Sequence, residues 1–176
     1  MPRTLKFSLG ISFALIGLVA VFLALGFAQD TKYKNSVEEV FNATPEQIWT
    51  YLIDVESIPN RRQEVISVEI IEKDPQGLVS VWKEIPDMGG YMKFRIGEFV
   101  PNVKLEVILF ESSYKMLGKW TYELTNKNGN TLVRITEETE IVSPLLRGAF
   151  FLAGRDSTLQ QELDFLRNFV RERIKN

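Results

Sequence analysis

The sequence predicts an α+β fold. A seven-stranded antiparallel sheet wraps around a long C-terminal helix, two short helices follow the first strand, and one apolar helix lies at the N-terminus. Three observations predict this fold. The stretch 67–141 alternates apolar and polar residues with a period of two, which is typical of strands. The stretch 144–174 carries leucines at helical spacing, and residues 7–28 carry no charge.

The first strand is predicted over Tyr33–Asn42, and a helix start follows it at once. Thr44 is placed to act as N-cap, Pro45 occupies the first helical position, and Gln47 completes a capping box. Pro59 ends this helix, and a second short helical segment follows. Two short helices are therefore expected between the first and second strands.

Six further strands are predicted from the alternation, and turn residues separate them. Gly, Pro, Asn and Asp cluster between the strands, as they do in tight turns. Because strands joined by short connections pair antiparallel, the whole sheet is expected to be antiparallel. The six strands are Ser67–Lys73, Leu78–Ile85, Tyr91–Val100, Lys104–Ser112, Gly118–Asn126 and Thr131–Ile141.

The last predicted element is a single long helix that begins at a Ser143–Pro144 cap and ends near Ile174. One face of the sheet needs an apolar cover, and this helix is the element able to supply it. Its apolar stripe consists of Leu152, Leu159, Leu163, Leu166 and Val170.

Composition excludes several classes of function. The chain has no cysteine and no histidine, which removes disulfides, thiolate and imidazole metal ligands, cysteine nucleophiles and Ser-His-Asp catalysis. The net charge of −2 argues against a nucleic-acid partner, since phosphate binding relies on a basic excess. No metal, no cofactor and no catalytic constellation is expected, which favours binding over catalysis without deciding between them.

The uncharged segment is long enough to cross a membrane. At about 1.5 Å per residue, a helix over residues 7–28 is about 33 Å long, the thickness of a bilayer core. Arg3 and Lys6 precede it, and positive flanks tend to stay in the cytoplasm. A single-pass membrane protein is expected, with its globular domain on the extracytoplasmic side. The predicted divisions are a flank at 1–6, a transmembrane signal-anchor helix at 7–28, a linker at 29–32 and a domain at 33–176.

A cleaved signal peptide is the alternative interpretation of this segment. Gly26 and Ala28 place small residues three and one before Gln29, as at a cleavage site. Cleavage there would secrete the domain and remove the anchor.

Three short motifs resemble those of the START-like, or SRPBCC, superfamily. Residues 42–49, Asn-Ala-Thr-Pro-Glu-Gln-Ile-Trp, are similar to the motif that these proteins carry after their first strand. Val55–Pro59 follows at the family's usual distance, and Gly118–Tyr122 is similar to its sixth strand. The family includes polyketide cyclases and aromatases, plant pathogenesis-related allergens, coenzyme-Q-binding proteins and lipid-transfer domains. The resemblance covers residues 33–176 and implies a helix-grip fold.

The resemblance also implies a cavity between the sheet and the long helix, usually for an apolar ligand. Many relatives carry an aromatic residue two positions after the proline, where this chain has Arg61, so the cavity mouth is expected to be more polar. The residues predicted at the mouth are Arg61, Arg62, Phe150 and Phe151.

Alternation along the strands indicates which side chains point toward this cavity. The candidates are Trp82, Glu84, Phe94, Ile96, Glu98, Trp120, Tyr122, Val133, Ile135 and Glu137. Three of them are carboxylates, which could orient a ligand or act in acid–base chemistry. The alternative is that these carboxylates lie at strand ends or in ion pairs, and that Tyr122 is a core tyrosine.

The leading functional hypothesis is a membrane-anchored domain that binds a lipid or another hydrophobic small molecule. The first alternative is a cyclase/dehydrase-like enzyme that uses Glu98, Glu137 or Tyr122 as acid and base. The second is a protein-interaction module without an open cavity. Cavity volume separates this last hypothesis from the other two.

Overall fold

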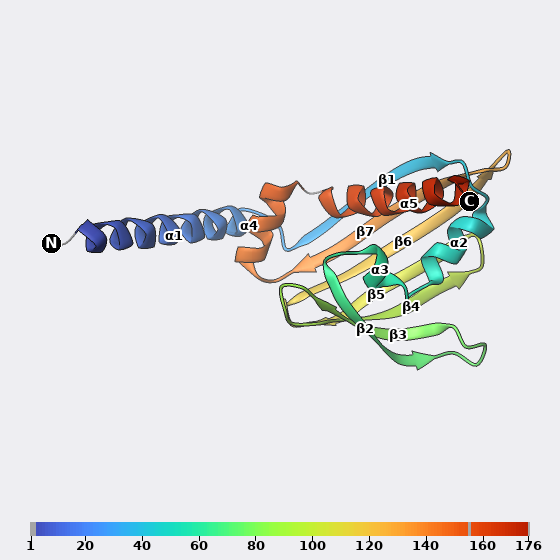
Figure 1. Ribbon diagram of the computed structural model, residues 1–176, viewed down its shortest axis with the longest axis horizontal. Helices are drawn as coiled ribbons and strands as arrows, with labels where there is room; N and C mark the ends of the chain where they lie inside the picture. Colours follow the sequence, from blue (N-terminus) through green and yellow to red (C-terminus); the bar gives the residue numbers. More distant parts are fainter. Residues whose placement is uncertain (1–2, 155, 176) are drawn as a thin grey trace.

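The computed structural model describes residues 3–154 and 156–175, with the side chains of residues 15–154 and 156–172. Figure 1 shows a curved sheet with α2, α3 and α5 over one face, and α1 extending away from one end. The elements are α1 (Arg3–Phe27), β1 (Lys32–Phe41), α2 (Pro45–Ile53), α3 (Ile58–Arg61), β2 (Val65–Lys73), β3 (Val79–Pro86), β4 (Met92–Val100), β5 (Lys104–Ser112), β6 (Met116–Lys127), β7 (Asn130–Ile141), α4 (Pro144–Ala153) and α5 (Ser157–Lys175).

The seven strands form one sheet in the order β1-β7-β6-β5-β4-β3-β2, and every neighbouring pair is antiparallel. Strands β2 to β7 therefore follow one another as a meander, and β1 closes the far edge against β7. The segment with α2 and α3 connects the two edges of the sheet. The predicted seven-stranded antiparallel sheet with a C-terminal helix across it is confirmed.

The start of α2 has the capping box that the sequence predicts. The Thr44 hydroxyl accepts a hydrogen bond from the Gln47 backbone N–H at 3.4 Å, and the Gln47 side chain accepts one from the Thr44 N–H at 2.9 Å. These two bonds satisfy backbone donors that have no partner within the helix. The cap fixes where α2 begins, and so aims its buried face at the sheet.

The prediction of one long C-terminal helix is wrong in one respect, because the helix is divided. Gly154 follows α4 with a φ of 96°, a conformation that favours glycine, and its N–H bonds to the Phe151 carbonyl. The second part, α5, lies along the sheet and buries its apolar stripe there. The buried residues of this stripe are Leu159, Leu163, Leu166 and Val170.

Two glycines allow α1 to pack directly against α4. A Cβ atom on Gly26 would lie 1.6 Å from the Pro144 carbonyl oxygen, and one on Gly148 would lie 2.0 Å from the Phe22 carbonyl oxygen. No other residue type would allow the two backbones to come this close.

A buried arginine completes the joint between α1 and α4. The Arg147 guanidinium donates hydrogen bonds to the carbonyl oxygens of Gly26 at 2.8 Å and of Ile141 and Val142 at 2.9 Å. Carbonyls at a helix C-terminus lack partners within the helix, and a cation is favourable there. Arg147 therefore links the end of α1 to the end of β7.

No helix in the described part of the chain is long and apolar enough to cross a membrane. The transmembrane helix predicted over residues 7–28 is therefore not supported. The side chains of residues 7–14, which belong to that prediction, lie outside the described residues.

Substituting Gly148 by alanine should separate α1 from α4. The added methyl would meet the Phe22 carbonyl, and overpacking of this kind destabilises by about 1–3 kcal/mol. We expect Gly148→Ala to lose hydrogen-exchange protection in residues 15–27. Gly17→Ala is the matched control, because a Cβ there meets nothing within 4 Å. Equal protection in the two variants would contradict the packing described here.

Candidate functional site

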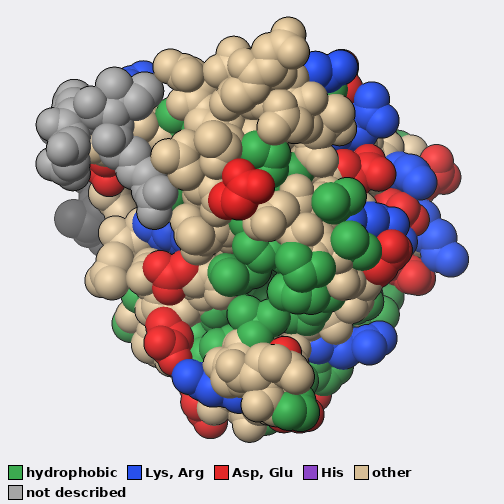
Figure 2. Space-filling model, turned by 90° about the vertical axis from the view of Figure 1, so that its right-hand side faces the viewer, with side chains coloured by type: hydrophobic (Ala, Val, Ile, Leu, Met, Phe, Trp, Pro, Cys, Tyr) green, Lys and Arg blue, Asp and Glu red, His purple; other side chains and the backbone are tan. Residues whose placement is uncertain are grey.

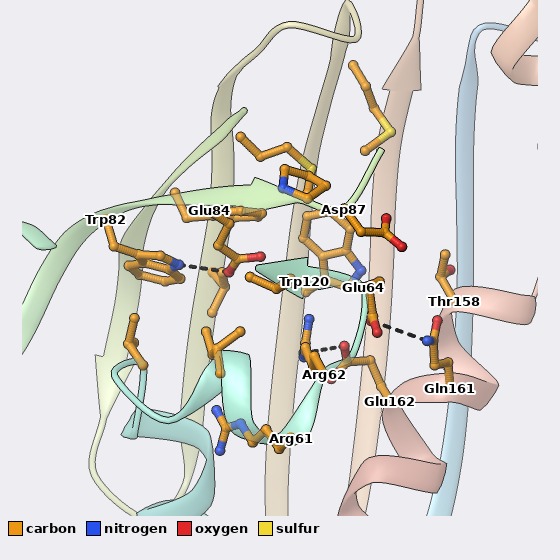
Figure 3. A pocket seen from close by; sticks show the side chains of 18 of the residues that line it. Arg61, Arg62, Glu64, Trp82, Glu84, Asp87, Trp120, Thr158, Gln161 and Glu162 are labelled. Atoms are coloured by element: carbon orange, nitrogen blue, oxygen red, sulfur yellow. Dashed lines mark hydrogen bonds and ion pairs between the residues drawn. The ribbon is translucent and has the colours of Figure 1, made fainter. Parts of the chain in front are cut away.

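A cavity of about 390 Å³ lies between the sheet and the helices α3, α4 and α5. This volume is within the range of small-molecule sites, about 300–1,000 Å³. Figure 3 shows side chains from strands on one side and from α3 and α5 on the other pointing into it. Both parts of the hydrophobic core contribute to its walls.

Aromatic and methionine side chains form the floor of the cavity on the sheet. The Trp82 and Phe94 rings stack with centroids 5.4 Å apart, and Trp120 lies tilted at 6.3 Å from Phe94. Met92 and Met116 extend this surface on β4 and β6. The floor is therefore apolar, and its methionines can adapt to the shape of an occupant.

A partly buried ion pair forms the polar end of the cavity, where α3 meets α5. Arg62 donates to one oxygen of Glu162, and the Tyr122 hydroxyl donates to the other at 3.1 Å. In Figure 3 the Arg62 and Glu162 side chains point toward one another beneath Trp120. Both carboxylate oxygens of Glu162 therefore have a partner.

The ion pair and its burial change the pKa values of its neighbours. Burial raises the pKa of Tyr122 well above its usual range, and the nearby Glu162 raises it further. Burial alone would lower the pKa of Arg62, but the combined attraction of Glu162 and of the acidic groups around it outweighs burial, and the pKa is raised. Arg62 is therefore a permanent cation, and Tyr122 is a hydrogen-bond donor rather than a base.

Glu84 is a second buried carboxyl group in the cavity. Its side chain is only 3% exposed and accepts a hydrogen bond from the Trp82 indole N–H at 2.9 Å. Burial raises the pKa of Glu84, although Arg62 and the Trp82 bond act in the opposite direction. The acid form is therefore favoured beyond its ordinary pH range, and in that form Glu84 can donate a hydrogen bond.

Arg61 lies between this cavity and a second depression on the outer side of α2 and α5. Its guanidinium stacks 3.9 Å from the centroid of the Tyr51 ring and donates to the Tyr51 carbonyl oxygen at 2.6 Å. Burial raises the pKa of Tyr51 to about 12. The outer depression has a volume of about 660 Å³ and is lined by polar residues of α2, α3 and α5 together with Phe165 and Phe169.

The opposite end of the cavity opens beside α4 and the turn between β3 and β4. Leu146 and Phe150 of α4 line it, together with Asp87 and Met88 of the turn. Met88 is 76% exposed, which makes it an apolar side chain at the rim. Glu64 lies nearby and accepts a hydrogen bond from Gln161 of α5 at 3.2 Å.

The structure brings most of the predicted site residues together around the cavity. The predicted residues that line it are Trp82, Glu84, Phe94, Trp120, Tyr122, Arg61, Arg62 and Phe150. Val133 and Ile135 lie instead in the core beneath α5, and Ile96 packs at its margin. These three do not line the cavity.

Two predicted residues line a smaller void near α4 instead. Glu137 and Phe151 border a space of about 40 Å³, where the Thr158 hydroxyl donates to the Glu137 carboxylate. Burial raises the pKa of Glu137, against the effect of the Thr158 bond. Neither residue contributes to the larger cavity, because the wall beside them is made by Phe150 and Thr158.

Glu98 was predicted in the cavity and lies outside it, which is a correction. The pairing of β4 with β5 shifts by one residue between Ile96 and Phe99, so the alternation of sides reverses there. Phe99 turns inward, and its ring centroid lies 5.2 Å from that of Trp49. Glu98 turns outward and forms an ion pair with Lys104. A bulge of this kind cannot be located from alternation alone.

Several cavity residues were not predicted from the sequence, and Glu162 is the most important of them. Glu162 lies three residues after Leu159 and four before Leu166, on the buried face of α5. A carboxylate within an apolar helical stripe indicates a buried acidic group that needs a polar partner nearby. Tyr51, one position before Leu52, faces the cavity in the same way from α2.

Within the described residues, no group of three or more acidic side chains is placed to hold a metal ion. The polar groups of the cavity are instead suited to hydrogen bonding and to ion pairing. The arrangement can hold an apolar molecule and satisfy a few polar atoms at one end.

No protein-family model matches the chain, and no curated protein matches it. Solved structures match most of it. The Zhui aromatase/cyclase from Streptomyces sp. R1128 is 12% identical with a TM-score of 0.69, covering 81% of this chain and 96% of that one. The chain has the START-like fold. At identities this low, the similarity concerns the fold alone.

Two further START-like structures show the same correspondence. A START superfamily protein from Mycobacterium smegmatis is 14% identical with a TM-score of 0.59, covering 82% of this chain and 97% of that one. A conserved protein from Geobacillus kaustophilus is 16% identical with a TM-score of 0.65, covering 81% and 96%. The helix-grip fold implied by the sequence motifs is therefore confirmed for the globular part.

Glu84 should make the stability of the fold fall as pH rises. Its pKa is raised above the ordinary value of 4.5, so above pH 4.5 the unfolded chain loses this proton before the folded one does. Stability is then lost as pH rises toward the pKa of the folded state. We expect the free energy of unfolding of the wild type to fall relative to that of Glu84→Gln across this window, in denaturant titrations between pH 4 and 8.

Glu111→Gln is the control with the opposite sign. Hydrogen bonds from Lys93 and Tyr91 lower the pKa of Glu111, so its contribution is present above pH 4.5 and lost as pH falls. The same pH trend in both variants would contradict the burial of Glu84.

Proposed function

We propose that this domain binds a hydrophobic small molecule, such as a lipid, in the cavity between the sheet and α5. The cavity itself carries the proposal. It combines an aromatic floor with polar groups concentrated where α3 meets α5, the pattern of sites that bury an apolar body and orient one polar end. A cavity of about 390 Å³ is large enough for such a molecule.

The structural neighbours are consistent with this proposal. One of them is described as an aromatase/cyclase and another as a START superfamily protein. START-like folds hold hydrophobic small molecules, which is consistent with a ligand of this kind.

Catalysis of the cyclase/dehydrase kind is the second candidate. It rests on the Tyr122 hydroxyl, which donates to Glu162, and on the Glu84 carboxyl group, whose acid form is favoured by burial. Glu98 and Glu137, the other acid–base candidates, do not line the cavity. The enzyme hypothesis therefore depends on fewer groups than the sequence suggested. The alternative of a protein-interaction module assumed that side chains fill the cavity, and the open cavity argues against it.

Attachment to a membrane through residues 7–28 stays a prediction from the sequence, with the domain on the extracytoplasmic side. Side chains of α1 such as Leu15, Ile16 and Leu18 are more than half exposed and would suit a lipid environment. We expect the full chain to resist alkaline carbonate extraction from membranes of expressing cells and to keep its N-terminus. A soluble product that begins at Gln29 would instead indicate a cleaved signal peptide.

Filling the cavity should abolish ligand binding. Val107 lines the cavity from β5, so Val107→Phe inserts a ring into the space that a ligand needs. We expect the affinity of the full chain for Nile red, an uncharged apolar dye, to fall about tenfold or more, a loss of about 1.4 kcal/mol. Fluorescence titration measures this.

Val103→Phe is the matched control, because Val103 is half exposed in the turn between β4 and β5. This end of the molecule also carries exposed hydrophobic side chains, which Figure 2 shows between charged borders. Surface binding there would not depend on Val107. Equal dye binding by the two variants would refute the cavity as the site.

A further inference from the structure

The charged residues that line the cavity are unequal in number. Among the described residues, its walls carry four carboxyl groups and two guanidinium groups, and no lysine. The acidic members are Glu64, Glu84, Asp87 and Glu162, and the basic members are Arg61 and Arg62. The lining is therefore acidic in sum, even when Glu84 is in its acid form.

Both cations are already engaged by the protein. Arg62 is paired with Glu162, whose second oxygen is held by Tyr122. Arg61 lies against the Tyr51 ring and bonds to the Tyr51 carbonyl oxygen. An incoming anion would have to compete with these partners for either guanidinium.

An anionic ligand would also meet unfavourable charges. A carboxylate near Arg62 approaches the Glu162 carboxylate as well, and repulsion between like charges is stronger in a buried site than in water. It would lose its hydration, and the Arg62 cation beside it is already paired with Glu162. An uncharged polar group avoids both costs.

Uncharged groups find hydrogen-bond partners at this end of the cavity. Among the described residues, the Nε–H groups of Arg61 and Arg62 and the Tyr51 hydroxyl are buried and have no hydrogen-bond partner. The Glu84 carboxyl group has only one of its oxygens bonded, to Trp82. A hydroxyl or carbonyl group can donate to or accept from such groups without changing their charge.

We propose that the cavity selects an uncharged amphiphile, with its hydroxyl or carbonyl group beside Glu84 and the Arg62–Glu162 pair, and discriminates against the ionised counterpart. This inference rests on the proposed function and names its ligand class. Alcohols, ketones, quinones and neutral glycerides belong to that class. Fatty acids and phosphorylated lipids do not.

Displacement of Nile red from the full chain tests the proposal. Decanol and decanoate have the same number of carbons, and at pH 8 only decanoate is charged. For the wild type, we expect the concentration of decanol that displaces half of the dye to be at least tenfold lower than that of decanoate. An uncharged alcohol is in general more apolar than the carboxylate of the same length, so an apolar cavity alone would favour decanol to some extent. The change of this ratio between variants is therefore the decisive quantity.

Two variants should move that ratio in opposite directions, and a third should leave it unchanged. Glu162→Gln leaves Arg62 unpaired, so the preference for decanol should fall at least tenfold or reverse. Arg62→Met leaves Glu162 without its cation, so the preference should increase. Glu111→Gln removes a carboxylate that does not line the cavity, so the ratio should stay within about twofold.

Thermal unfolding shows whether each variant is folded. Should Glu162→Gln not fold, Arg62→Met carries the test, and an unchanged or reduced preference for decanol in that variant would overturn the inference. Decanoate binding to the wild type as tightly as decanol would also overturn it, while the proposed function stands. Failure of both ligands and of Nile red to bind would instead overturn the proposed function itself.

Discussion

The ion pair between Arg62 and Glu162 is the interaction on which the cavity depends. It joins α3 to α5 across the end of the cavity, 100 positions apart in the sequence. A buried charge without a partner is strongly unfavourable, so each of these residues requires the other. Tyr122 then connects the pair to the sheet through β6. The helices and the sheet are thereby held at a fixed separation, and the apolar floor beside the pair stays uncovered.

Most of the fold could be predicted because its signals are local. The alternation of β2 to β7 and the Thr44 capping box depend on neighbouring residues, and each reappears in the structure. The joint between α1 and α4 could not be predicted. It depends on Gly26 and Gly148 and on carbonyls bound by Arg147, which the chain brings together from distant positions.

The site was predicted in part, and the errors have identifiable physical causes. Trp82, Glu84 and Trp120 follow a regular pleat, so alternation placed them correctly beside the cavity. Glu98 follows a register shift in β4, which reverses the alternation. Glu162 belongs to a helical stripe that was interpreted only through its apolar members. Buried polar residues are therefore best sought at positions that lie on the apolar face of a helix but carry a polar side chain.

A crystal structure of the full chain purified from its expression host would show whether the cavity holds a ligand. We expect density for a bound molecule along the floor formed by Trp82, Phe94 and Trp120. Its polar end should lie within hydrogen-bond distance of Glu84 or Arg62, and the Arg62–Glu162 pair should remain intact. A cavity closed by its own side chains, or filled by ordered water alone, would contradict ligand binding at this site.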